Sequence, residues 1–405
     1  SSFWLKAGAS DQDSTLDEVL SVVQPGQSIS RQSHFAIKPR SNDVALRHTF
    51  LSGEKLEVTW GAETARTRTP ITLVRDSTLH LAATPSLQES LDQVDHDRSD
   101  NVYAIARWQD ATLRLELGSA WVDYRKDRDI LVSRQAAVGQ DVRLMENYRL
   151  RKGAPIAGVT WRFAPSALAR AACRRWVRPT ALDSLAPVAV AGMPLDDQLV
   201  LSGGILEQCR AQWEWTQSPS TFIAAFVERS RVHNLVSPLD GVLNAHSDVT
   251  NLDRLRNRAL SPVPKPDLLE DLPVYGQGIA RRVNVAFEQI VTPCVGARIH
   301  YTYTDSENTA AGLEGRRIPY LARHQGNFAL TWAPGWKTFV TTQAVYRSRR
   351  YADEGNTIGL PAGWDAQVNL FVESRDKHWA VEAYGANFFK KETKDLYGIV
   401  VSYRF

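Results

Sequence analysis

The chain has 405 residues, 43% hydrophobic and 23% charged, with a formal net charge of +3 at pH 7. This charge is too small to indicate a nucleic-acid partner. The longest apolar run, around residues 185–195, is much shorter than the roughly 18 to 20 residues that a membrane-spanning helix needs. Composition therefore argues against a helical membrane protein and against a nucleic-acid-binding protein.

Alternation of apolar and polar residues with a period of two recurs along the chain and predicts strands. A short strand is expected over Phe3 to Ala9, and the first clear hairpin joins Val44–Leu51 to Lys55–Thr64 through a tight turn. The later hairpins are predicted at 101–108 with 112–124, 156–163 with 168–177, 208–217 with 221–231, 282–291 with 295–304, 327–332 with 337–347, and 364–373 with 379–388. Each of these hairpins turns within a few residues.

Short helices are also predicted in three of the connections between hairpins. Apolar residues at helical spacing over 16–23 indicate one helix, and Ser86 with Glu89 forms a capping box at the start of a second. Asn251 precedes a third helical pattern.

The last strand, Leu396 to Phe405, places aromatic and aliphatic residues at every second position and ends on an aromatic residue. Such an ending is similar to the signal that the barrel-assembly machinery recognises in bacterial outer-membrane barrels, which assigns that role to Tyr403 and Phe405. We expect this strand to pair with residues 377–388 and with the first strand, which would leave no free sheet edge.

Together these elements predict an all-β fold, namely a transmembrane antiparallel up-and-down β-barrel of about 16 strands over residues 1–405. Short turns and both termini are expected on the periplasmic side, with long extracellular loops, in the outer membrane of a Gram-negative bacterium. The long connections are predicted at 10–43, 65–100, 125–155, 178–207, 232–281, 305–326, 348–363 and 389–395. Aromatic residues such as Trp121 and Tyr124 are expected to form girdles at the membrane interfaces.

Charged residues alternate with the lipid-facing ones and are predicted to line the pore. They are Arg47, Glu57, Arg114, Glu116, Arg162, Arg170, Arg174, Arg210, Glu214, Arg282, Glu288, Arg298, Glu373, Glu382 and Arg404. Two interpretations are open: a wall of cross-strand ion pairs in pore water, or a binding track for an anionic solute.

The longest connection, over residues 231–281, is the candidate for a gate inside the pore. It carries Asp267, Glu270 and Asp271, which could pair with pore arginines, and the alternative is a loop that only caps the outer rim.

The sequence shows no spaced catalytic triad, no metal-binding motif and no phosphate loop, so neither an enzyme nor a cofactor is expected. The only cysteines are Cys173, Cys209 and Cys294. Cys173 and Cys209 flank one loop, but the predicted hairpin pairing places them out of register, so a disulfide between them is not expected.

Two families resemble parts of the chain. Segments 318–334 and 346–356 resemble the closing hairpins of TonB-dependent receptor barrels, although the plug domain and the energy-coupling box are missing and 405 residues are too few for 22 strands. Segment 168–208 resembles the barrels fused to periplasmic tetratricopeptide repeats in exopolysaccharide exporters. That second resemblance, with a start at Ser1 and no Met, implies a processed or truncated chain and a periplasmic amino-terminal domain outside it.

The sequence therefore predicts an outer-membrane channel or transport protein, with export of a polysaccharide or another polymer as one role. The alternative is a plugless receptor or adhesion barrel that serves as a surface docking site. Expected partners are outer-membrane lipid and lipopolysaccharide, the barrel-assembly machinery and a periplasmic repeat domain or partner protein.

Overall fold

The computed structural model describes the chain except residues 12, 25–26, 81–86, 136–139, 181–184, 187–188, 195–199, 201, 235–275, 336, 352–353, 358, 387–395 and 404–405. In the described part the regular structure consists of strands alone, and eighteen of the strands join one antiparallel sheet. Among these residues no helix is long and apolar enough to cross a membrane.

The strands of the sheet follow one another in chain order. The first nine are β1 (Ser2–Asp11), β2 (Ser14–Gln24), β3 (Gln27–Ile37), β4 (Arg40–Ser52), β5 (Leu56–His80), β6 (Leu87–Gln109), β7 (Leu113–Gln135), β8 (Gln140–Ala164) and β9 (Ala167–Val177). The others are β10 (Ile205–Ser218), β11 (Thr221–His233), β12 (Gln277–Thr292), β13 (Val295–Asn308), β14 (His324–Gly335), β15 (Thr338–Arg347), β18 (Gly363–Glu373), β19 (Trp379–Ala386) and β20 (Leu396–Tyr403). A separate ribbon pairs β16 (Arg350–Tyr351) with β17 (Gly359–Leu360).

The pairing arranges the eighteen strands in sixteen positions across the sheet, which we call lanes. β1 pairs with β4 and β2 with β3, while β3 and β4 both pair with the long β5, so β1–β2 and β3–β4 are each one interrupted lane. From β5 onward each strand of the sheet pairs with the next one along the chain. The prediction of an all-β, up-and-down antiparallel fold with about 16 strands and seven tight turns is confirmed.

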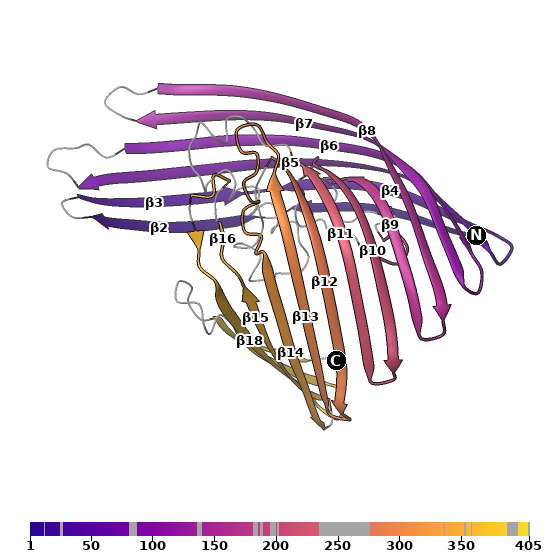
Figure 1. The fold of residues 1–405 in the computed structure, drawn as a ribbon. Helices are drawn as coiled ribbons and strands as arrows, with labels where there is room; N and C mark the ends of the chain where they lie inside the picture. Colours follow the sequence, from indigo (N-terminus) through magenta and orange to yellow (C-terminus); the bar gives the residue numbers. More distant parts are fainter. Residues whose placement is uncertain are drawn as a thin grey trace.

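The long connections predicted in the first half are largely strand. β5 to β8 are 23 to 25 residues long and include most of the segments 65–100 and 125–155. Figure 1 shows these strands extending past the shorter strands that follow. The predicted strands are too short because both faces become largely polar in the half of these strands away from the tight turns, which removes the apolar alternation.

Two of the three predicted helices are wrong. Residues 16–23 lie in β2 and residues 87–94 lie in β6, where the backbone is paired with neighbouring strands. Cross-strand pairing outweighs the local helical spacing and the capping box in both segments. The third helix, after Asn251, falls outside the described residues.

The prediction of barrel closure holds on one side only. β20 pairs with β19 from Ala386↔Leu396 to Trp379↔Tyr403, as expected. No backbone pairing joins β20 to β1 in the described parts of the two strands, so the expected closing pair is not found. The sheet is nevertheless strongly curled: in Figure 1 the first lanes and the later lanes run in clearly different directions.

The two faces of the sheet differ sharply in exposure. On β6 and β7, Val102 and Trp121 are 60% and 57% exposed, whereas the next residues, Tyr103 and Val122, are buried. An apolar face left open in this way is typical of a sheet whose outer side contacts lipid. Tyr124 is fully buried on the opposite face, so its predicted place in an interfacial girdle is wrong.

A disulfide links two adjacent strands of the sheet. Cys173 on β9 and Cys209 on β10 are direct cross-strand partners and are bonded to each other. The prediction that they are out of register is wrong because β10 begins at Ile205, which pairs with Val177, so each cysteine lies four residues from the connection. Cys294 is free and exposed in the tight turn between β12 and β13.

Candidate functional site

The more buried face of the sheet carries the polar residues that sequence analysis singled out. The strand registers place the described members of the predicted set on this one face, which we call the inner face, except Arg162, which lies at a register shift of β8 and has no partner in either register. The residues on the inner face are Arg47, Glu57, Arg114, Glu116, Arg170, Arg174, Arg210, Glu214, Arg282, Glu288, Arg298, Glu373 and Glu382. Arg404 lies outside the described residues.

Near the tight turns of β5 to β7, carboxylates and guanidinium groups alternate across the strands. Arg107 donates from Nη1 to Oε1 of Glu57 at 2.6 Å, and Arg114 Nη2 lies 2.7 Å from Oε1 of Glu116. Glu116 is almost completely buried and also lies 3.7 Å from Arg107 Nε. Arg107 is not among the predicted pore-lining residues, although its alternation with Trp108 and its position opposite Glu57 indicate the same face.

Glu228 forms the centre of a second cluster, on β9 to β12. Its Oε2 accepts a hydrogen bond from Gln208 Nε2 at 2.8 Å, and its carboxylate lies 3.5 Å from Arg282 Nη1 and 3.9 Å from Arg210 Nη1. Arg174 in turn donates to Gln208 Oε1 at 2.8 Å. The cluster joins three predicted arginines through a carboxylate and an amide that sequence analysis did not select.

A third cluster lies farther along β6 and β7, and all of its members except Tyr124 come from segments predicted to be loops. Asp95 contacts Lys126 at 2.9 Å and Arg128 at 3.0 Å, and Tyr124 donates its hydroxyl hydrogen to Asp97 at 2.6 Å. All five side chains are buried. Charged residues continue to alternate along both strands in these segments. Because the apolar residues that usually alternate with them are missing here, the pattern is read as a loop and not as a strand.

The connection between β9 and β10 packs onto the inner face. Val190 and Met193 form a small bridge, and they pack with Ala191 against Ala172 and Ile156 of the sheet. The fit is close, because a Cβ on Gly158 would lie 2.7 Å from Val190 Cγ1.

Polar contacts fix this connection at several points along its length. Arg170 Nη1 donates to the carbonyl of Ala191 at 2.9 Å, and Arg174 Nη2 donates to the carbonyl of Pro194 at 2.6 Å. The amide N–H of Ala186 donates to Oε1 of Glu63 at 2.8 Å, which joins the connection to β5. Two predicted pore arginines therefore hold a segment of the chain that covers part of the inner face.

A second connection, between β13 and β14, also reaches the inner face. Ile318 is buried in an apolar cluster with Leu206, Val232 and Ala280, and Leu321 packs against that cluster. Val200, from the β9–β10 connection, belongs to the same cluster. The described parts of two connections thus cover the inner face near the ends of β10 to β12 that lie opposite the tight turns.

Most of the other predicted site residues are not described by the structure. Asp267, Glu270 and Asp271 of the predicted gate, and Phe405 of the insertion signal, lie outside the described residues. Tyr403 packs its ring against Trp379, with ring centroids 4.5 Å apart. In the described part of the chain no group of three or more His, Cys, Asp or Glu side chains is arranged to hold a metal ion.

Comparison with known proteins supports the same type of fold. The model of a TonB-dependent receptor-like β-barrel matches residues 282–388. No curated protein sequence matches the chain.

Several solved receptors share the fold at low sequence identity. The ferric yersiniabactin uptake receptor FyuA from Yersinia pestis has a TM-score of 0.59 and 8% identity, and the match covers 98% of this chain and 56% of the receptor. The siderophore receptor PiuA and the ferric preacinetobactin receptor BauA, both from Acinetobacter baumannii, have TM-scores of 0.55 and 0.53 and identities of 12% and 13%. These matches cover 100% and 99% of this chain but 66% and 60% of the receptors.

The fold is thus that of a bacterial outer-membrane barrel. More narrowly, the chain resembles the barrels of TonB-dependent receptors, and it spans between about half and two thirds of the length of these three receptors.

Proposed function

We propose that the chain forms an outer-membrane β-barrel that transports a solute across the outer membrane of a Gram-negative bacterium. The observation that carries this proposal is the contrast between the two faces of a sixteen-lane antiparallel sheet, one apolar and open, the other lined by charged and amide side chains. Such a sheet satisfies its backbone in lipid once its edges meet, so the proposal includes pairing between β1 and β20.

In this arrangement the seven tight turns and both termini face the periplasm. The ends of the long strands β5 to β8 that lie away from the tight turns extend beyond the outer surface of the membrane. The native cysteine Cys294, exposed in a tight turn, provides a direct probe. A membrane-impermeant maleimide should leave Cys294 unlabelled in intact cells and label it after the outer membrane is permeabilised. An Asp127→Cys variant, at an exposed position of β7, should be labelled in intact cells. Labelling of Cys294 in intact cells would contradict this orientation.

Uptake is favoured over export as the direction of transport. The receptors that share the fold include a ferric yersiniabactin uptake receptor, and the inner face is partly covered by two connections, as suits a barrel that opens only for a specific solute. We therefore place the receptor-like barrel ahead of the polymer conduit. The position of the arginines on the inner face agrees with a solute that carries negative charge, but Arg170 and Arg174 also anchor the β9–β10 connection.

The β9–β10 connection is a second candidate for the gate, besides the predicted gate in residues 231–281. Three of the pore arginines available to the gate acids have other contacts in the structure: Arg174 contacts Gln208 and Pro194, while Arg210 and Arg282 contact Glu228. Single-channel current should therefore be measured for a chain lacking residues 245–275 and for a Gly158→Leu variant, whose side chain would displace the β9–β10 connection. A current increase confined to the deletion would assign the gate to residues 231–281, and one confined to the variant would assign it to the β9–β10 connection.

A further inference from the structure

Four arginines stand in one line across the outward face of β5 to β8. Arg66 is the direct cross-strand partner of Arg98, Arg98 of Arg125, and Arg125 of Arg149. We call these four residues the arginine row. Directly opposite residues have Cβ atoms roughly 5 Å apart, so the row places four guanidinium groups along about 15 Å of surface.

The row faces away from the inner face and lies just beyond the apolar part of the sheet. Arg98 on β6 and Arg125 on β7 lie on the same face as Val102 and Trp121, respectively. Each arginine is four positions farther from the tight turn than its apolar neighbour, which is roughly 13 Å along the strand. Val102 and Trp121 are the last large apolar residues before the charges begin. Under the proposed function, on which this inference rests, the row therefore lies at the level of the lipid headgroups in the outer leaflet.

The acidic residues nearby do not balance this charge. The neighbouring row toward the apolar part, in register across the same strands, holds Thr64, Asp100, Asp123 and Arg151, so five arginines stand against two aspartates, a net charge of +3. The next row outward holds Arg68 and Asp127, whose charges cancel, together with His96 and Asn147.

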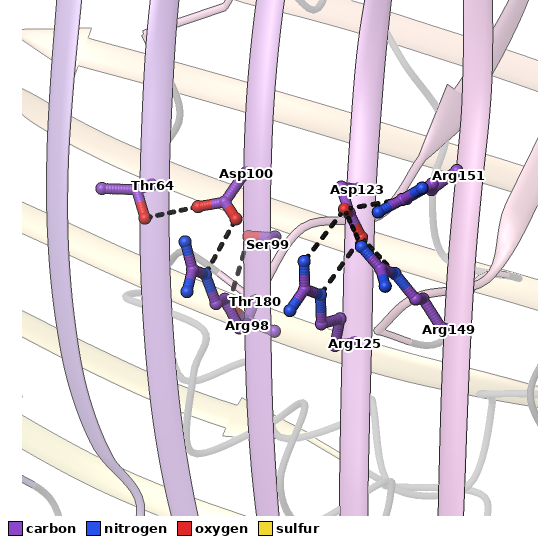
Figure 2. Close-up of polar contacts among 9 residues, drawn as sticks. All are labelled: Thr64, Arg98, Ser99, Asp100, Asp123, Arg125, Arg149, Arg151 and Thr180. Carbon is purple, nitrogen blue, oxygen red and sulfur yellow. Dashed lines mark hydrogen bonds and ion pairs between the residues drawn. The ribbon is translucent and has the colours of Figure 1, made fainter.

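Figure 2 shows that the carboxylates of Asp100 and Asp123 are the acceptors for Arg98, Arg125, Arg149 and Arg151. Asp123 accepts hydrogen bonds from Arg125, Arg149 and Arg151 at 3.2, 2.8 and 3.1 Å. The single carboxylate of Asp123 therefore serves three guanidinium groups. Arg98 is paired with Asp100 at 2.8 Å.

Arg66 makes no ion pair with any residue that the structure describes. Like charges directly opposite each other on a sheet destabilise it, and the row contains three such pairs in succession. A surface that keeps them exposed, next to an apolar face, is complementary to an anion whose other end is apolar. Arginine suits this role because its guanidinium group binds phosphate oxygens with two parallel hydrogen bonds.

We propose that the arginine row binds the phosphate groups of lipopolysaccharide in the outer leaflet around the barrel. The acyl chains would lie against the apolar face near Val102 and Trp121, while the phosphates would lie between the guanidinium groups. The ligand is thus a phosphorylated lipid held on the outer wall, distinct from any solute carried by the inner face.

The test compares lipopolysaccharide binding by the full chain and by an Arg98→Gln, Arg125→Gln, Arg149→Gln triple variant, both purified in a neutral detergent. The matched control is Arg143→Gln, an outward arginine on β8 six residues farther from the apolar part and paired with Asp129 at 2.5 Å. We expect affinity to fall tenfold or more in the triple variant, equal to about 1.4 kcal/mol, and to stay within twofold in the control. Binding by the unchanged chain should also weaken as salt is raised.

Inorganic phosphate at the same phosphorus concentration distinguishes a lipid site from a simple anion site. Phosphate that occupies the row as well as lipopolysaccharide does would overturn the lipid assignment. Equal lipopolysaccharide affinities in the triple variant and the unchanged chain would overturn the role of the row. If the triple variant does not fold, salt-independent lipopolysaccharide binding by the unchanged chain would overturn it instead. Failure of the unchanged chain to insert into phosphatidylcholine vesicles would overturn the proposed function and leave the binding result to stand by itself.

Discussion

Replacing Glu228 with Ala should destabilise the sheet far more than replacing Glu288, although both are glutamates on the inner face paired with arginine. The Glu228 side chain is 1% exposed, and its arginine neighbours Arg210 and Arg282 are 16% and 14% exposed. Glu288 and its partner Arg298 are 38% and 57% exposed. The two positions therefore separate the effect of burial from the effect of pairing.

The magnitudes follow from solvation. Removing one partner of a buried ion pair costs about 3 to 5 kcal/mol because it leaves an uncompensated charge in a medium of low dielectric. The slight exposure of Arg210 and Arg282 places the expected loss for Glu228→Ala near the lower end, at about 3 kcal/mol. Loss of an exposed pair costs about 0 to 1 kcal/mol, which is the expectation for Glu288→Ala.

Equilibrium unfolding in urea, with the refolded protein in lipid vesicles and tryptophan fluorescence as the signal, would measure both losses. A Glu228→Gln variant, which keeps an acceptor for the Gln208 amide but removes the charge, should fall between the wild type and Glu228→Ala. Equal losses for Glu228→Ala and Glu288→Ala would refute the reasoning, because they would show that water reaches both carboxylates equally.

Three further predictions concern the disulfide, the chain end and the arginine row. Without reductant a maleimide should modify only Cys294 in unfolded protein, and reduction should expose Cys173 and Cys209 while lowering stability by about 3 to 4 kcal/mol, as expected for a loop of this length; labelling of all three cysteines before reduction would disprove the bond. Deleting Phe405 should reduce the amount of heat-modifiable barrel in the outer membrane, and an unchanged amount would remove the basis for the insertion signal. Replacing Asp123 with Asn should maintain or increase lipopolysaccharide affinity, since the aspartate competes with phosphate for three arginines; a tenfold loss would show that Asp123 organises the site.

Much of the fold is predictable because a sheet with one apolar and one polar face imposes a strict period of two. That period alone places residues such as Glu57, Arg174 and Arg282 on the same face of the sheet. Tight turns with Pro and Gly then fix the hairpin boundaries, so the number of lanes follows directly.

The rest is not predictable from local pattern. Asp95 and Arg128 escape prediction because the strands continue where neither face is apolar, so no alternation of hydrophobicity remains to mark them. The cysteine register depends on where β10 begins, at Ile205, which a polar connection does not reveal. The packing of Val190 onto Gly158 is a contact between distant segments, and only the three-dimensional arrangement shows it.

Conductance of the purified chain in planar lipid bilayers tests the central claim most directly. A transport barrel with a polar inner face should give discrete single-channel steps, small in the unchanged chain and larger when the connections that cover the inner face are removed or displaced. Absence of any current above that of bare lipid, in the unchanged chain, in the 245–275 deletion and in the Gly158→Leu variant alike, would contradict a solute pathway along the inner face.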